Sequence, residues 1–170
     1  MKLEDAIEEF EYLEKLPGKK LLLKGNHDYW WTTIARMRNF LKEKGIKTID
    51  FLHNNAYVFE DKIIAGVRGC NEIEVEEKRL KREIARLELS IQEGIKEFGE
   101  GKEIIVFTHY PPFTRNNEFI NIMKNHGIKR CIYGHLHGES LKDAVRGNKD
   151  GIEYIVASCD DTDFKLLTIR

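Results

Sequence analysis

The stretch Glu103-Ile104-Ile105-Val106-Phe107-Thr108-His109-Tyr110-Pro111-Pro112 decides which fold this sequence can form. Its apolar run, bounded by polar residues, predicts a buried β-strand of the kind found in parallel sheets. His109 follows the strand directly, and the two prolines fix the backbone, so the loop should be stiff. Ligands of open α/β sheets bind beyond the carboxyl ends of the strands. We therefore expect a functional site at the loop that carries His109.

Two other segments repeat this arrangement of an apolar run followed by histidine. Gly25-Asn26-His27-Asp28 follows the run at 20–24, and Gly134-His135-Leu136-His137-Gly138 follows the run at 130–133. Together the three segments hold four of the six histidines in the chain. Imidazole is the commonest protein metal ligand and transfers protons readily near neutral pH. Three strand ends that bring imidazoles to one rim predict a metal-centred active site.

Each motif taken alone also has an ordinary structural interpretation. Asp28 can orient His27, and the amide oxygen of Asn26 can bind a metal ion, yet both side chains can equally bond the backbone of a turn. A single histidine at a strand end, such as His109, is more often structural than a ligand. His135 and His137 are the most informative, because side chains one residue apart reach the same side of an extended segment. Such a pair can bind one metal ion or two neighbouring ions.

Length and composition favour a soluble globular protein, with residues 1–170 forming a single domain. Hydrophobic residues make up 41% of the chain and charged residues 34%, with a formal net charge of −1. That charge gives no reason to expect a nucleic-acid partner, and the basic run at 78–82, interleaved with glutamates, is interpreted as the solvated face of a helix. No apolar run is long enough to cross a membrane. Three widely spaced cysteines and no signal core favour a reduced, cytoplasmic protein.

Hydrophobic periodicity predicts a mixed α and β chain, for which no repeat or linker is visible. Helices are expected at the N-terminus and at 31–44, 75–98 and 115–126. Strands are expected at 20–24, 47–51, 56–60, 62–67, 103–108, 130–133, 153–157 and 165–169. The longest helix should bury Ile84, Leu87, Ile91 and Ile95 against a sheet.

In chain order the three histidine motifs resemble the third, fourth and fifth motifs of the calcineurin-like metallophosphoesterases. The resemblance covers residues 25–137. It implies an α/β fold of stacked mixed β-sheets flanked by helices. It also implies an enzyme that hydrolyses a small phosphoester, as a phosphatase or phosphodiesterase, with two divalent metal ions. Mn, Fe, Zn, Co and Ni all suit such ligands.

The same resemblance implies a role for each residue of the motifs. Asn26, His109 and His135 would hold one metal ion, and His137 would be a ligand of the other. His27 would contact the phosphate and protonate the leaving group, with Asp28 orienting it. The side chains of Trp30, Trp31, Tyr110 and Arg115 are candidates to line a pocket near the metal ions.

The sequence departs from the family pattern at its N-terminal side. The family opens with an Asp-x-His motif and a Gly-Asp motif, whose aspartate bridges both metal ions, and neither occurs here. We therefore expect an N-terminally truncated domain, the C-terminal three-quarters of the family fold, that binds at most one metal ion. Two functions stay open: an impaired metal-dependent phosphoesterase, or a non-catalytic metal-binding or interaction remnant. The acidic residues at 160–163 are interpreted as a polar turn, and the sequence gives no oligomeric state.

Overall fold

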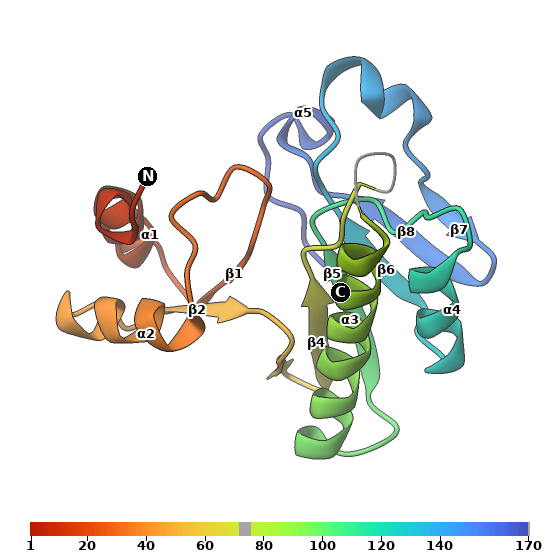
Figure 1. Ribbon diagram of the computed structural model, residues 1–170, viewed down its shortest axis with the longest axis horizontal. Helices are drawn as coiled ribbons and strands as arrows, with labels where there is room; N and C mark the ends of the chain where they lie inside the picture. The colour runs from red at the N-terminus through yellow and green to blue at the C-terminus, as the bar shows by residue number, and fades with distance from the viewer. Residues whose placement is uncertain (72–75, 170) are drawn as a thin grey trace.

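The computed structural model describes residues 1–71 and 76–169, which form an α/β structure (Figure 1). In chain order the elements are η1 (Leu3–Ala6), α1 (Ile7–Lys15), β1 (Lys20–Leu23), α2 (Ile34–Glu43), β2 (Ile49–Leu52), β3 (Ala56–Phe59), β4 (Lys62–Val67), α3 (Glu77–Phe98), β5 (Glu103–Thr108), α4 (Glu118–Asn125), β6 (Arg130–Tyr133), η2 (Gly138–Asp143), β7 (Gly147–Lys149), β8 (Ile152–Val156) and α5 (Cys159–Thr162). None of the helices in these residues is both long and apolar enough to cross a membrane.

The strands form two sheets, as the predicted fold class requires. The larger sheet has six strands in the order β3-β4-β5-β6-β8-β7, and the smaller is the parallel pair β1-β2. Strands β4, β5, β6 and β8 run parallel, while β3 and β7 are antiparallel edge strands. Figure 1 shows α3 and α4 on one face of the larger sheet and α1 and α2 beside the smaller one. The prediction of mixed sheets flanked by helices is confirmed.

The four parallel strands are in a register that ends them at one level. Val67 of β4 pairs with Thr108 of β5, which pairs with Tyr133 of β6, which in turn pairs with Val156 of β8. The loops that leave these strands therefore start side by side at one edge of the sheet. This edge is the place where ligands of parallel sheets bind.

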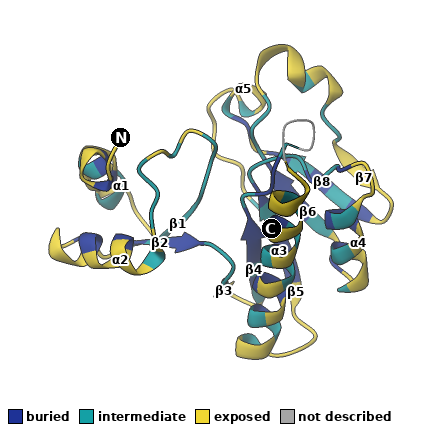
Figure 2. Ribbon diagram, viewed as in Figure 1, coloured by how far each residue is buried: buried dark blue, intermediate teal, exposed yellow. Residues whose placement is uncertain are grey.

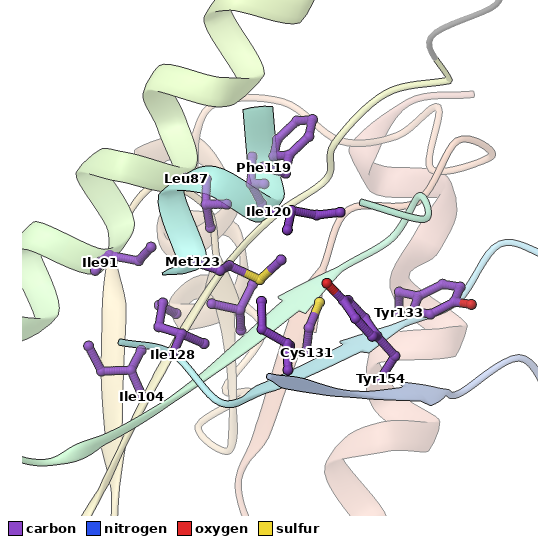
Figure 3. Packing of buried hydrophobic residues seen from close by; sticks show 14 of the residues in the cluster. Leu87, Ile91, Ile104, Phe119, Ile120, Met123, Ile128, Cys131, Tyr133 and Tyr154 are labelled. Atoms are coloured by element: carbon purple, nitrogen blue, oxygen red, sulfur yellow. The ribbon is translucent and has the colours of Figure 1, made fainter. Parts of the chain in front are cut away.

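Two hydrophobic cores hold the layers together. The larger core lies between the six-stranded sheet and helices α3 and α4, and Figure 3 shows its side chains packed between these elements. The smaller core joins η1, α1, α2 and β2 around Phe10, whose ring meets that of Trp30 edge-on at a centroid distance of 5.0 Å. Figure 2 shows that the outward faces of α2 and α3 are exposed. A cleft of about 480 Å³ separates the two sheets, with Leu21 on one side and Phe107 on the other.

Helix α3 covers the sheet through one apolar side. Leu87 and Ile91 are fully buried, and Ile84 and Ile95 are half-buried against the same core. Gly94 lets the helix approach β3 and β4 closely, since a Cβ atom there would lie 2.6 Å from the Ile63 side chain. The predicted helix is thus confirmed from residue 77 to residue 98, while Val75 lies outside the described residues.

The C-terminal region differs from the prediction. Residues 165–169, expected to form the last strand, have no strand conformation in the structure, and Leu166 is almost fully exposed. Asp163 and Phe164 have φ values of 53° and 55°, so two residues in the left-handed conformation precede this segment. Ile169 lines the cleft between the sheets together with Phe107, although the segment has no strand conformation. The edge beside β8 is occupied by β7, a three-residue strand too short and polar to predict from hydrophobic pattern.

Truncation of Leu87 to alanine should lower the free energy of unfolding by about 2–5 kcal/mol, because the side chain is removed from a packed core. Leu89 is on the same helix but is 41% exposed, so Leu89→Ala should change stability by about 0.5 kcal/mol or less. Urea unfolding followed by circular dichroism measures both. Equal losses for the two variants would show that α3 packs through a different side.

Candidate metal centre

The loops after β4, β5 and β6 are joined by backbone hydrogen bonds at the carboxyl edge of the sheet. The N–H groups of His109 and Tyr110 donate to the carbonyl oxygen of Arg68 at 3.2 and 3.0 Å. The N–H group of Gly134 in turn donates to the carbonyl oxygen of His109 at 3.2 Å. These bonds fix the start of the His109 loop between its two neighbours, so the imidazole has a defined position.

The motif from the smaller sheet reaches the same place through Asn26. Its Oδ1 atom lies 2.7 Å from Nε2 of His109, and its N–H donates to the same nitrogen at 3.2 Å. When Nε2 of His109 accepts that hydrogen bond, it carries no proton, and its lone pair faces the lone pairs of Oδ1. Two such acceptor atoms repel each other, and a cation bound by both would stabilise the arrangement. Gly25 permits the approach, since a Cβ atom there would lie 3.4 Å from Cε1 of His109 and 3.2 Å from a carboxylate oxygen of Asp28.

Asp28 and His27 lie beside this contact. The carboxylate of Asp28 accepts the N–H of Gly25 at 2.5 Å, which closes the turn that carries the motif. Nδ1 of His27 lies 3.4 Å from the hydroxyl of Tyr29, and the imidazole is exposed to solvent. Asp28 therefore bonds the backbone of its own turn, as the structural interpretation of the motif expects. The side chain of Asn26 does not, and points toward His109 instead. That Asp28 orients His27 stays a prediction.

His135 joins the centre through an unusual backbone conformation. Its φ is 71°, and the N–H of Leu136 donates to the carbonyl oxygen of Gly134 at 2.9 Å, which forms a γ-turn around the histidine. Such turns are rare and strained, and strained residues concentrate at functional sites. The ring of His135 lies 5.0 Å from that of His109 and 4.2 Å from that of Tyr110, measured between centroids.

The γ-turn sends His137 to a different set of partners. We expected an extended segment with both imidazoles on one side, but the positive φ at His135 interrupts the alternation. Nδ1 of His137 lies 3.2 Å from Oδ1 of Asp160 and 3.8 Å from Sγ of Cys159. The N–H of Gly138 donates to Oδ2 of Asp160 at 3.0 Å. The acidic segment is thus more than the polar turn predicted for it.

Electrostatics keep the central imidazole neutral. Burial, together with the neighbouring His135 and Arg68, lowers the pKa of His109 to about 4. A neutral imidazole is the form that binds metal ions. Hydrogen bonds from Gly138, His137 and Cys159 lower the pKa of Asp160, so this carboxyl group is ionised at neutral pH.

Two groups of ligand atoms follow from this geometry. Asn26, His109 and His135 offer one amide oxygen and two imidazoles, a neutral set that fits a divalent ion with waters in its remaining positions. His137, Cys159 and Asp160 form a second group, with one ligand atom from each lying within 4.8 Å of the others. The metal-ligand roles assigned to Asn26, His109, His135 and His137 stay predictions.

The aromatic residues proposed for a pocket divide into two groups. The ring of Tyr110 contacts that of His135 at the centre, with the ring planes tilted by 52°, whereas Trp30 packs against Phe10 in the smaller core. The ring of Trp31 lies between Phe51 and His53, at centroid distances of 5.2 and 6.3 Å.

Sequence reasoning missed three residues at this edge. Asp160 and Cys159 lie 23 and 22 positions from His137, and no local pattern links them. Arg68 was overlooked because it follows β4, a strand end without histidine. The two histidines excluded from the site lie elsewhere: Nε2 of His126 is 2.8 Å from the carboxylate of Glu88, and His53 is half-buried beside Trp31.

Comparisons with known proteins support the resemblance seen in the sequence. A family model described as calcineurin-like phosphoesterase matches residues 2–139. A solved crystal structure matches with a TM-score of 0.57 at 14% sequence identity, which shows a shared fold. The match covers 90% of this chain and 62% of the solved one, so this chain spans less than two thirds of that protein. A search of curated proteins found no match.

The low pKa of His109 predicts how the stability of the metal-free protein depends on pH. The folded imidazole takes up its proton near pH 4, whereas the unfolded imidazole takes it up near its usual 6.5. The unfolded chain therefore binds more protons in this window, and the free energy of unfolding should fall as the pH falls through it. His109→Gln should make this fall smaller. Urea unfolding of both proteins across the window tests this, and identical slopes would contradict it.

Proposed function

The chain belongs to the calcineurin-like phosphoesterase family, and we propose that it is a metal-dependent hydrolase of small phosphoesters, acting as a phosphatase or phosphodiesterase. The observation that carries the proposal is the meeting of Asn26, His109 and His135 from three separate strand ends. The oxygen of Asn26 lies 2.7 Å from Nε2 of His109, and the imidazole of His135 lies against the same ring.

Each residue at the edge has a distinct task in this proposal. A divalent ion bound by Asn26, His109 and His135 would supply Lewis acidity to the phosphoryl oxygens. His27 is exposed beside this centre and can contact the phosphate from the solvent side, where it gives a proton to the leaving oxygen. Asp28 holds the turn that presents His27, through its bond to the N–H of Gly25.

The number of bound ions decides how active the chain is. The sequence contains neither an Asp-x-His nor a Gly-Asp motif, and two divalent ions without a bridging carboxylate would repel each other strongly. We infer that the chain as given binds at most one ion at the centre and hydrolyses phosphoesters slowly. The missing motifs also favour a second candidate function, a non-catalytic metal-binding or interaction remnant.

The cysteines support a cytoplasmic location for this activity. Cys131 and Cys159 are free thiols, and Cys70 and Cys131 are buried. Burial raises the pKa of Cys131 to about 12, so its thiol stays protonated. Reduced thiols of this kind are typical of a reducing compartment.

Replacement of His27 and of His109 should have different consequences. His27→Ala should lower turnover about 10²–10⁴-fold with an unchanged metal content, because a general acid acts on the rate. His109→Ala should remove the bound ion, because it deletes a ligand. Hydrolysis of a nitrophenyl phosphate, together with metal analysis of each purified variant, measures both effects. Loss of metal from the His27 variant would make the role proposed for it wrong.

Saturation with manganese should give at most one tightly bound ion per chain. The physical reason is the repulsion between two divalent ions, because the given sequence contains no Gly-Asp motif to supply the bridging aspartate. Equilibrium dialysis followed by elemental analysis measures the ratio. Two tightly bound ions and rapid turnover would contradict the expectation. If Asp160→Asn then reduced the ratio to one, the second ion would belong to the group around His137.

A further inference from the structure

We propose that a pocket beside the candidate metal centre binds a second anionic group of the substrate, so that the substrate carries a phosphate or carboxylate besides the phosphoester. The pocket has a volume of about 470 Å³ and lies between the smaller sheet and the start of α3. Among the described residues, the cationic ones that line it are Lys24, Arg68, Arg79, Arg82 and Arg86, the acidic one is Glu83, and His53 also lines it. The assignment of this anionic group to the substrate rests on the proposed function.

The pocket concentrates positive charge in a chain whose net charge is −1. Nη1 of Arg86 lies 2.6 Å from the carboxylate of Glu83, so this pair neutralises itself. Four cationic side chains remain around one concave surface. These four side chains line one pocket of about 470 Å³, so their charges repel one another. An anion in the pocket would remove this mutual repulsion.

Three side chains that line the pocket carry buried polar atoms without a hydrogen-bond partner. Among the described residues, Nε1 of Trp31, Nε of Arg68 and Oε2 of Glu83 are buried and lack a hydrogen bond, and all three residues line it. Buried donors and acceptors are usually paired, and an unpaired one costs stability. Nε1 of Trp31 and Nε of Arg68 are donors, so a small shift of these side chains toward an anion in the pocket would give both a partner.

The pocket adjoins the metal centre through two of its cations. Lys24 directly precedes the motif that carries Asn26, and the carbonyl oxygen of Arg68 accepts the N–H of His109. The guanidinium of Arg68 lies 5.6 Å from the centre of the Tyr110 ring, which itself contacts the ring of His135. One small molecule can therefore place its phosphoester at the centre and a second anionic group among the arginines.

The basic run at 78–82 divides between pocket and solvent. Lys78 and Lys81 fit the interpretation as a solvated helix face, and Lys81 pairs with Glu77 at 2.6 Å. Arg79 and Arg82, three residues apart, turn to the side of α3 that lines the pocket. A concave pocket of this size suits a small polyanion better than the extended backbone of a nucleic acid.

Binding of inorganic pyrophosphate to the metal-free protein tests the pocket directly. The double variant Arg79→Gln/Arg82→Gln should weaken binding roughly tenfold or more, because it removes two charged donors. The matched control Lys78→Gln/Lys81→Gln removes the same charge from the same helix segment, and should change affinity by about twofold or less. Titration calorimetry measures both, and circular dichroism checks that each variant is folded.

The outcomes separate the pocket from the proposed hydrolysis. The proposed anion site would be wrong if both double variants bound pyrophosphate equally weakly, or if the unaltered chain did not bind pyrophosphate. Selective loss in the arginine variant would support it, even if the metal-loaded chain hydrolysed nothing. In that case the proposed function would fail and the anion site would stand. In an active protein, the arginine variant should raise KM for a bisphosphate and leave KM for a simple monoester nearly unchanged.

Discussion

The register of the parallel strands is the constraint on which the rest of the structure depends. Val67, Thr108, Tyr133 and Val156 lie in one row across β4, β5, β6 and β8. The residues that follow therefore emerge at one edge, although up to 89 positions separate them in the chain. A slip of one residue in any strand would reverse which side chains face the core. Packing of the core therefore also fixes the positions of Arg68, His109 and the loop after β6.

A second constraint joins the two sheets at this edge. The contact between Asn26 and His109 connects the end of β1 to the end of β5, and Gly25 makes it possible by its lack of a side chain. The same segment continues backward into Lys24, which lines the cationic pocket. The candidate metal centre and the cationic pocket therefore share one segment of backbone. A movement of this segment would shift Asn26 and Lys24 together. This is a structural reason to expect that one ligand contacts both the centre and the pocket.

The sequence predicted the parts of the fold that local pattern determines. The strands at 62–67, 103–108 and 130–133 have the predicted bounds, because each is a run of apolar residues between turn signals. The strand expected at 165–169 was wrong, since the left-handed backbone at Asp163 and Phe164 leads into a segment without strand conformation. Likewise, the γ-turn at His135 could not be predicted, because a positive φ is uncommon for a histidine.

Features formed by distant residues lay beyond any local pattern. The pairing of His137 with Asp160 joins two loops, and the cationic pocket joins β1, β4 and α3. In the sequence, the arginines of α3 were indistinguishable from an ordinary solvated face. Only the structure shows that Lys24 and Arg68 line the same pocket as the arginines of α3.

The most direct test of the account is the position of the metal ion in a crystal grown with manganese. Anomalous diffraction locates the ion independently of any assumption about ligands. The account predicts one anomalous peak bonded to Oδ1 of Asn26 and to the imidazoles of His109 and His135. A crystal of the manganese-loaded protein without that peak, or with manganese only beside His137, Cys159 and Asp160, would contradict it.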